Sequence, residues 1–284
     1  MDFALTEEQA QIVDMVDAFA AEKLAPYTLA WDREAHFPLD VMRELAELGL
    51  AGIFVDPEHG GSGLGRLDGA LIFEGLAKGC VSTSAFMTIH NMVAWMIDRF
   101  GNAGQRAHWL PKLCAMETVA SYCLTEPGSG SDAAALRTTA RLEGNSSYVL
   151  NGAKAFISGA GASDLYAVMC RTGEAGPGGI SCLLVEKGTP GLSFGKPEEK
   201  MGWNSQPTAV VTFEDCRVPA ENRLGPAGDG FRFAMKGLDG GRINIAACSL
   251  GGAAWALDAA KAHVQERIAF GKPLSAQQAV QFKL

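Results

Sequence analysis

The chain is poor in the features that mark several common classes of protein. Its five histidines show no His-Glu-x-x-His spacing, and no Cys-x-x-Cys pair occurs among its seven cysteines, at positions 80, 114, 123, 170, 182, 216 and 248. Scattered cysteines of odd number are typical of reduced thiols packed as small apolar groups, and neither residue type indicates a metal site. Walker A and Gly-x-Ser-x-Gly patterns are absent too, which argues against a P-loop nucleotidase and against a hydrolase with a nucleophile elbow.

Positive charge is scarce as well. Lys and Arg number 24 against 32 Asp and Glu, a net charge of −8. An acidic chain without a basic stripe argues against nucleic acid as a partner, but a few local cations could still hold an anionic ligand such as a CoA ester. There is no run of 18 apolar residues, and Met1 leads into Leu5-Thr6-Glu7-Glu8 without a basic or apolar leader. These absences predict no membrane span and a soluble protein of a bacterial cytoplasm.

The 284 residues divide into three successive regions with different sequence patterns. Residues 1–117 read as an N-terminal helical domain, with a capping box at Thr6 and Gln9, a helix start just after Pro38, and helical patterns over 68–79, 84–100 and 103–115. From 118 to 225, short β-branched and aromatic runs predict an antiparallel β-domain, a sandwich or a barrel. Asn151-Gly152 lies between two such runs and predicts a hairpin turn.

From residue 226 the pattern returns to helix. Helices are predicted over 231–238 and 242–269, with a break at Gly251-Gly252, an end at Gly271-Lys272-Pro273, and a further helix capped by Ser275. The chain stops at Leu284 inside this last helical pattern, so we expect residues 226–284 to be the start of a helical-bundle domain whose fold is incomplete. The predicted fold class is therefore α+β and multidomain: all-α, then antiparallel β, then a truncated helical bundle.

The most informative stretch is 122–132, which reads YCLTEPGSGSD. A strand-like run leads into a Thr-Glu-Pro turn and a Gly-Ser-Gly-Ser loop, which offers backbone N–H groups and hydroxyls to a phosphate or a polar ring. An ordinary tight turn would also account for it. The dinucleotide fingerprint requires a strand, a helix and an acidic residue about 20 positions on, whereas strand patterns follow here.

The order C-L-T-E-P-G-S-G-S-D resembles the flavin-binding signature of the acyl-CoA dehydrogenase family, and the resemblance covers the whole chain. Long runs resemble the branch of that family that acts on isobutyryl-CoA: IHNMVAWMIDRFG (89–101), NGAKAFISGAG (151–161), GISCLLVEKGTPGLSFGK (179–196), GWNSQPT (202–208) and GLDGGRINIA (237–246). The resemblance implies a helical domain, a β-domain and a helical bundle, with FAD between the last two.

The resemblance also implies a set of site residues. The flavin would be lined by Tyr122, Cys123, Leu124, Thr125, Glu126, Pro127, Gly128, Ser129, Gly130 and Ser131, with the Thr125 hydroxyl on the pyrimidine edge of the ring. Phe156-Ile157-Ser158 stands where the family places an aromatic ring and a hydroxyl beside the flavin; many members have Trp and Thr there. In the element that begins at Arg267, the residues Arg267, Gln277 and Gln278 would reach the FAD of a neighbouring subunit, which implies a homo-oligomer, a dimer of dimers.

For the substrate, the resemblance implies contacts from Ser131 to the pantetheine of the acyl-CoA and from the segment Asp239, Gly240, Gly241 and Arg242. The implied reaction is α,β-dehydrogenation of the thioester, with electrons passed on to an electron-transfer flavoprotein. Most members carry the catalytic glutamate beyond the position where this chain ends, and a minority carry it where this chain has Gly241. We therefore identify no catalytic residue and expect a polypeptide ending at Leu284 to be inactive by itself.

Three alternatives stay open at this point. The same scaffold could prefer 2-methylbutyryl-CoA or a short straight chain such as butyryl-CoA, or the chain could be a non-catalytic fragment that binds flavin or a partner subunit. A hydrolase or a nicotinamide enzyme is disfavoured, because neither a nucleophile elbow nor a βαβ unit is predicted.

Overall fold

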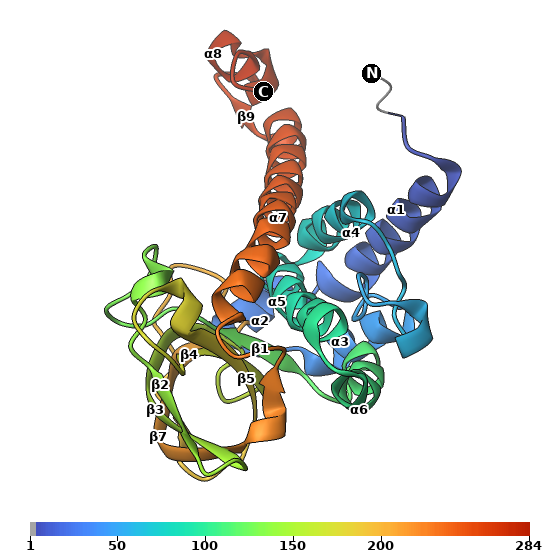
Figure 1. Cartoon of the computed structure of the whole chain (residues 1–284). Helices are drawn as coiled ribbons and strands as arrows, with labels where there is room; N and C mark the ends of the chain where they lie inside the picture. Colours follow the sequence, from blue (N-terminus) through green and yellow to red (C-terminus); the bar gives the residue numbers. More distant parts are fainter. Residues whose placement is uncertain (1–3) are drawn as a thin grey trace.

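The computed structural model describes residues 4–284, which fold in three successive parts (Figure 1). Helices occupy residues 7–114, a sheet that curls round on itself occupies residues 120–224, and one long helix, α7 (Gly230–Glu266), leaves the sheet and rises past the first helices. The predicted fold class, with an all-α first part, a β middle part and a helical last part, is confirmed.

The helices of the first part are α1 (Glu7–Phe19), which continues as a π-helical turn over Ala20–Leu24, α2 (Thr28–Glu34), α3 (Leu39–Glu47), α4 (Arg66–Gly79), α5 (Val81–Phe100) and α6 (Ala103–Cys114). Three of them begin where the sequence signals predict, at residues 7, 39 and 103; α4 and α5 begin two and three residues before their predicted patterns, and α2 was not predicted. At the start of α1 the Thr6 hydroxyl accepts from the Gln9 amide at 3.2 Å and the Gln9 side chain accepts from the Thr6 amide, so the capping box is confirmed. Pro38 is the residue directly before α3, as predicted.

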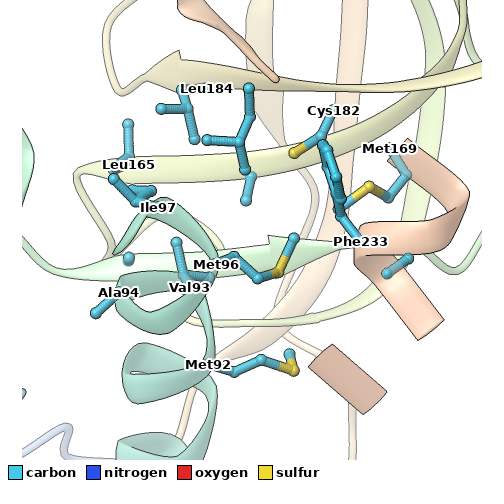
Figure 2. Packing of buried hydrophobic residues seen from close by; sticks show 14 of the residues in the cluster. Met92, Val93, Ala94, Met96, Ile97, Leu165, Met169, Cys182, Leu184 and Phe233 are labelled. Atoms are coloured by element: carbon cyan, nitrogen blue, oxygen red, sulfur yellow. The ribbon is translucent and has the colours of Figure 1, made fainter. Parts of the chain in front are cut away.

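Helix α5 lies at the centre of the contact between the helices and the sheet, and most of its residues are buried there. Figure 2 shows the cluster that it forms with the strands behind it and with α7; the labelled side chains are Met92, Val93, Ala94, Met96, Ile97, Leu165, Met169, Cys182, Leu184 and Phe233. Next to this cluster the Phe100 ring stacks on Phe233 with centroids 4.0 Å apart. One core therefore joins all three parts, so a shift of α7 would be transmitted to the sheet.

In the described residues the middle part is one eight-stranded sheet of order β6-β7-β3-β2-β4-β5-β8, with β1 added beside β4. The strands are β1 (Ala120–Cys123), β2 (Thr139–Glu143), β3 (Ser147–Ser158), β4 (Leu165–Arg171), β5 (Ile180–Glu186), β6 (Leu192–Phe194), β7 (Thr208–Pro219) and β8 (Arg223–Leu224). Neighbours run antiparallel except for β1 with β4 and β2 with β4, which are parallel. The predicted antiparallel domain therefore also contains a parallel component.

The predicted hairpin turn at Asn151-Gly152 is wrong. Both residues lie inside β3, where the pairing with β7 shifts register between Leu150 and Gly152. Gly152 has φ 142°, and a Cβ there would lie 2.7 Å from the Thr138 hydroxyl oxygen. Gly152 therefore allows a bulge-like irregularity inside β3 rather than a turn. The Asn151 side chain forms hydrogen bonds with Asp215 on the paired strand.

The predicted break at Gly251-Gly252 is also wrong, because α7 is continuous from Gly230 to Glu266. Gly251 is required by packing: a Cβ there would lie 2.1 Å from the Glu74 carbonyl oxygen, so α4 and α7 approach closely at this point. Within residues 4–284, α7 is the one helix with the length and hydropathy of a membrane span, a test that core helices of soluble proteins also pass.

Beyond α7 the chain ends in small elements at the far end of that helix (Figure 1). Strands β9 (Ile268–Ala269) and β10 (Lys272–Pro273) form a hairpin through a turn in which Phe270 and Gly271 have φ 54° and 74°. Helix α7 therefore ends at Glu266 rather than at residue 269. The final helix, α8 (Gln278–Gln281), is preceded by Gln277, so the prediction that Ser275 caps it is wrong: Ser275 lies in a 3₁₀ turn.

All seven cysteines are free and buried, as their scattered positions predicted. Burial raises the pKa of Cys114, Cys216 and Cys248 to about 11, and that of Cys123 and Cys170 to about 12. These thiols stay protonated at neutral pH and serve as apolar packing groups.

His90 links the end of α6 to the start of the sheet. Its ring is fully buried, with Nε2 lying 3.0 Å from the Leu113 carbonyl and Nδ1 accepting from the Ala120 amide at 3.2 Å. The two bonds require the neutral ring with its proton on Nε2, and burial lowers the pKa of His90 from 6.5 to about 4.

This depressed pKa predicts a pH-dependent stability. Neutral His90 makes its full contribution to the free energy of unfolding above pH 6.5. This contribution is lost as the pH falls from 6.5 to 4, because the unfolded chain takes up the proton at a higher pH than the folded chain does. The loss over that window amounts to about 3 kcal/mol. In urea unfolding at pH 7 and pH 4, His90→Gln is expected to show a smaller difference between the two pH values by about that amount. An equal pH dependence in the variant and the wild type would contradict this assignment.

Candidate active site

A cavity of about 400 Å³ lies where β1, the loop after it, the end of β3 and α7 meet. It is lined by Ile89, Tyr122, Leu124, Thr125, Gly130, Ser131, Ala133, Phe156, Ile157, Ser158, Met235, Leu238 and Arg242. None of these lining residues is acidic. Hydroxyl groups from β1, the loop after it and β3 therefore line the same cavity as the apolar side chains and the one guanidinium of α7. A mostly apolar lining with a few polar groups is usual for a small-molecule site.

The loop after β1 is a tight turn in which Glu126 and Ser129 exchange backbone hydrogen bonds of 2.9 and 3.1 Å. A Cβ on Gly128 or on Gly130 would meet no atom within 4 Å, so the space beside both glycines is open. Gly130 faces the main cavity, whereas Glu126, Pro127, Gly128 and Ser129 line a second cavity of about 320 Å³ on the other side of the loop. The open backbone at Gly130 is a surface that a flat ligand can approach.

Residues of β1 alternate between the two sides of the strand. Cys123 points away from the main cavity into the core of the sheet. Tyr122 points toward the cavity; its hydroxyl is buried and has no hydrogen-bond partner in the part of the chain that the structure describes, and burial raises its pKa. A buried polar atom without a partner beside an open cavity is the position where a ligand supplies the missing bond.

Phe156 reaches the cavity because β3 bulges. The register with β7 shifts between Lys154 and Ile157, and Phe156 has φ 57°, a left-handed conformation that a bulky residue rarely adopts. Its ring is 65% exposed and lines the cavity. Strain of this kind is found at functional sites, and here it turns an aromatic face toward the place where a ligand would lie.

Ser158 follows at the end of the same strand. Its hydroxyl accepts from the Gln206 amide at 2.8 Å, and its carbonyl accepts from the Ser121 hydroxyl. Gln206 belongs to the run 202–208 but was not predicted as a site residue. Its amide fixes the Ser158 hydroxyl at the cavity edge.

Helix α7 contributes Met235, Leu238 and Arg242 to the cavity. Sequence reasoning predicted only Arg242, although Leu238 and Met235 stand four and seven residues before it and thus share its helix face. Gly240 points elsewhere: a Cβ there would lie 2.4 Å from the Arg66 guanidinium, which sits over the rings of Phe54 and Trp95 at 4.1 and 4.9 Å. Of the predicted substrate residues, Ser131 and Arg242 line the cavity, and Asp239, Gly240 and Gly241 do not.

The three residues predicted to reach a neighbouring flavin lie far along the chain from this cavity. Arg267 follows the end of α7, Gln277 precedes α8 and Gln278 is its first residue. All three lie at the end of α7 opposite to the sheet (Figure 1). Arg267 and Gln278 are exposed and Gln277 is partly exposed. The chain's own cavity therefore does not include them.

Lys154, which sequence reasoning missed, lies directly beneath the loop. Its ammonium is fully buried and contacts a Glu126 carboxylate oxygen at 2.8 Å. Burial lowers the pKa of Lys154, and Glu126 offsets part of that effect. Burial alone would raise the pKa of Glu126, but hydrogen bonds from Lys154, Thr138 and the Arg137 amide lower it. A lysine inside an apolar strand two residues before the exposed aromatic was the signal available in the sequence.

The residues around the main cavity fit a flavin ring. They supply an aromatic face, an open glycine backbone, hydroxyls at the edge and an unpartnered buried phenol. Together with a helical part, a curled sheet and a long helix that closes the cavity, this site defines a flavin-dependent dehydrogenase. The chain belongs to the acyl-CoA dehydrogenase family: it matches the family's N-terminal domain over residues 6–117, its middle domain over 121–216 and its C-terminal domain over 228–284. It is thus the chain of an FAD-dependent acyl-CoA dehydrogenase.

Two relatives share more than half of its residues. Isobutyryl-CoA dehydrogenase, mitochondrial, of Bos taurus is 57% identical over 280 residues, and the protein of the same name from Dictyostelium discoideum is 60% identical over 281 residues. Each comparison covers 99% of this chain and 67% of the relative. Both relatives are mitochondrial, and this finding overturns the expectation of a bacterial cytoplasmic protein.

Solved structures agree with the fold. Butyryl-CoA dehydrogenase from Megasphaera elsdenii superposes with a TM-score of 0.95 at 38% identity, over 100% of this chain and 75% of that one. The FAD complex of PigA superposes with a TM-score of 0.94 at 29% identity, over 100% of this chain and 75% of the other.

Proposed function

We propose that this protein oxidises isobutyryl-CoA to methacrylyl-CoA in the breakdown of valine. The observation that carries the proposal is the cavity in which Phe156, Gly130 and Arg242 converge from a strained strand, an open loop and α7. The choice of acyl group is supported by the two isobutyryl-CoA dehydrogenases that are 57% and 60% identical over almost all of this chain.

We infer the following roles. FAD, when bound, supplies the acceptor for the hydride that leaves the β-carbon. The chain's own residues hold and shield the reactants: the loop over 122–131 offers its backbone and the Thr125 hydroxyl to the ring, and Phe156 and Ser158 cover one edge. Ser131 and Arg242 face the acyl-CoA, and the cation of Arg242 favours the negative charge that develops when the α-proton leaves. We assign the proton acceptor to none of the described residues.

We further propose that Arg267, Gln277 and Gln278 contact the flavin of a neighbouring subunit in a homotetramer, and that an electron-transfer flavoprotein reoxidises the enzyme. Their exposure at the end of α7, away from the chain's own cavity, supports a role toward another subunit. We also propose the domain boundaries at residues 117/118 and 225/226. A contact between the acyl-CoA and the segment Asp239, Gly240 and Gly241 is proposed on the family resemblance alone.

A second candidate substrate is butyryl-CoA, since a butyryl-CoA dehydrogenase has the same fold with a TM-score of 0.95. The FAD-loaded full-length protein is to be assayed with isobutyryl-, 2-methylbutyryl- and butyryl-CoA and an artificial electron acceptor, with bleaching of the flavin absorption as an independent readout. We expect kcat/KM for isobutyryl-CoA to exceed both other values by roughly tenfold or more: 2-methylbutyryl-CoA has one methylene too many, a difference that commonly gives this range, and butyryl-CoA lacks the α-branch. A higher value for butyryl-CoA would replace the first candidate by the second.

A further inference from the structure

Beneath the loop that faces the cavity lies the buried cation Lys154. Its side chain is fully buried, and its ammonium donates to the Leu124 carbonyl at 3.0 Å and to the Glu126 carboxylate at 2.8 Å. These two acceptors stand on either side of Thr125, whose own carbonyl accepts from the Ala155 amide at 2.8 Å. The three residues that enter the loop are therefore each bonded to the same short stretch of β3.

The carboxylate of Glu126 extends this attachment to a second strand. One of its oxygens accepts from the Arg137 amide at 2.6 Å, and the oxygen that meets Lys154 also accepts from the Thr138 amide at 2.9 Å. Arg137 and Thr138 lead directly into β2. The beginning of the loop is thus held between β3 and the entry to β2, and hydrogen bonds to charged groups are the strong members of such networks.

The same stretch of β3 also aims the aromatic side chain of the cavity. Lys154 points inward to the loop, and the bulge that follows turns Phe156 outward into the cavity. A buried ammonium is costly unless it is paired and fully bonded, so its place fixes the register of the strand at this point. We therefore infer that Lys154 sets both the position of the loop after β1 and the direction of the Phe156 ring.

We propose that Lys154 is a positioning residue for the flavin: it holds Leu124 and Glu126 so that Thr125 and the following glycine loop face the cavity in the shape that receives the ring. Lys154 itself does not line that cavity. The proposal rests on the proposed function, because it requires that the cavity take FAD.

The test separates positioning from plain stability. Lys154→Met leaves Glu126 as an unpaired buried charge and is expected to lower both the melting temperature and the affinity for FAD. In the double variant Glu126→Gln/Lys154→Met no buried charge remains, so the melting temperature of the FAD-free protein is expected to recover most of the loss. The Leu124 carbonyl still lacks its donor, and the Kd for FAD is expected to stay roughly tenfold or more above the wild-type value.

The readouts are the Kd for FAD from flavin fluorescence, the circular dichroism of the bound flavin and the melting temperature of the FAD-free protein. The matched control is Lys78→Met, which removes the half-exposed pair with Asp17 (2.8 Å) in the helical part and is expected to leave the Kd for FAD unchanged. A double variant that binds FAD as tightly as the wild type, with the same flavin dichroism, overturns the positioning role. If the wild type itself binds no FAD, the proposed function fails instead.

Discussion

Replacing Arg242 by glutamine is expected to lower kcat/KM for the acyl-CoA substrate by about 100-fold, the effect of removing one charge-stabilising donor from an active site. The melting temperature is expected to change little, because the Arg242 side chain is exposed and no bonded partner of it occurs in residues 4–284. Steady-state kinetics with isobutyryl-CoA and thermal unfolding, both on the full-length protein, measure the two quantities.

The matched control is Arg232→Gln on the same helix. Arg232 pairs with Asp229 at 2.6 Å and lies outside the cavity, so its loss is expected to leave kcat/KM within about twofold, since exposed ion pairs contribute little. Equal effects from the two substitutions would show that Arg242 acts only through the net charge of α7 and would remove it from the site.

Replacing Gly230 by alanine is expected to destabilise the protein by about 3 kcal/mol, at the upper end of common overpacking costs. Gly230 is the first residue of α7 and rests on the backbone of β5: a Cβ there would lie 2.3 Å from the Ser181 carbonyl carbon and 2.7 Å from the Cys182 amide nitrogen. A backbone contact cannot be relieved by a rotamer change, so α7 must move away from the sheet.

That movement has a consequence for the cavity, because α7 supplies one of its walls. The Kd for FAD is expected to rise by roughly tenfold, as measured by flavin fluorescence alongside urea unfolding. Gly237→Ala serves as the control. Gly237 lies two turns further along α7, and the three atoms nearest to a Cβ there would be Met92 and Met96 side-chain atoms at 3.4 Å. Methionine side chains adapt readily, so this variant is expected to keep its stability and its FAD affinity. Wild-type stability in Gly230→Ala would refute the contact.

Local signals in the sequence were sufficient for the order of the parts and for several helix starts. The capping box at Thr6 and the proline before α3 act within a few residues, so they could be recognised without the fold. Glycines were misread for the opposite reason. Gly152 leaves room for Thr138, and Gly251 leaves room for the Glu74 carbonyl of α4. Both partners are far from the glycine along the chain, so the reason for each glycine becomes visible only in the folded structure.

Part of the predicted loop lines the cavity together with Arg242, and these residues carry the motif resemblance; the loop residues concerned are Tyr122, Leu124, Thr125, Gly130 and Ser131. Lys154 and Gln206 were missed, since they act on the loop and on Ser158 rather than facing the cavity. Their function follows from burial and hydrogen bonds, which no spacing in the sequence reveals. Asp239, Gly240 and Gly241 were predicted as a contiguous segment, but a helix turns successive residues by about 100° and presents only one of them to a given neighbour.

Because all seven cysteines are buried, the folded protein is expected to react with thiol reagents almost as if it contained no cysteine. A disulfide or maleimide reagent added to the native enzyme has no ready thiolate to attack, so the rate of modification reports how often the structure opens. The native cysteines, which lie between α4 and α5, in α6, in α7 and in the sheet, thus report unfolding of each of these parts. A single cysteine introduced on the surface would carry a spectroscopic label at one site without the removal of any natural residue.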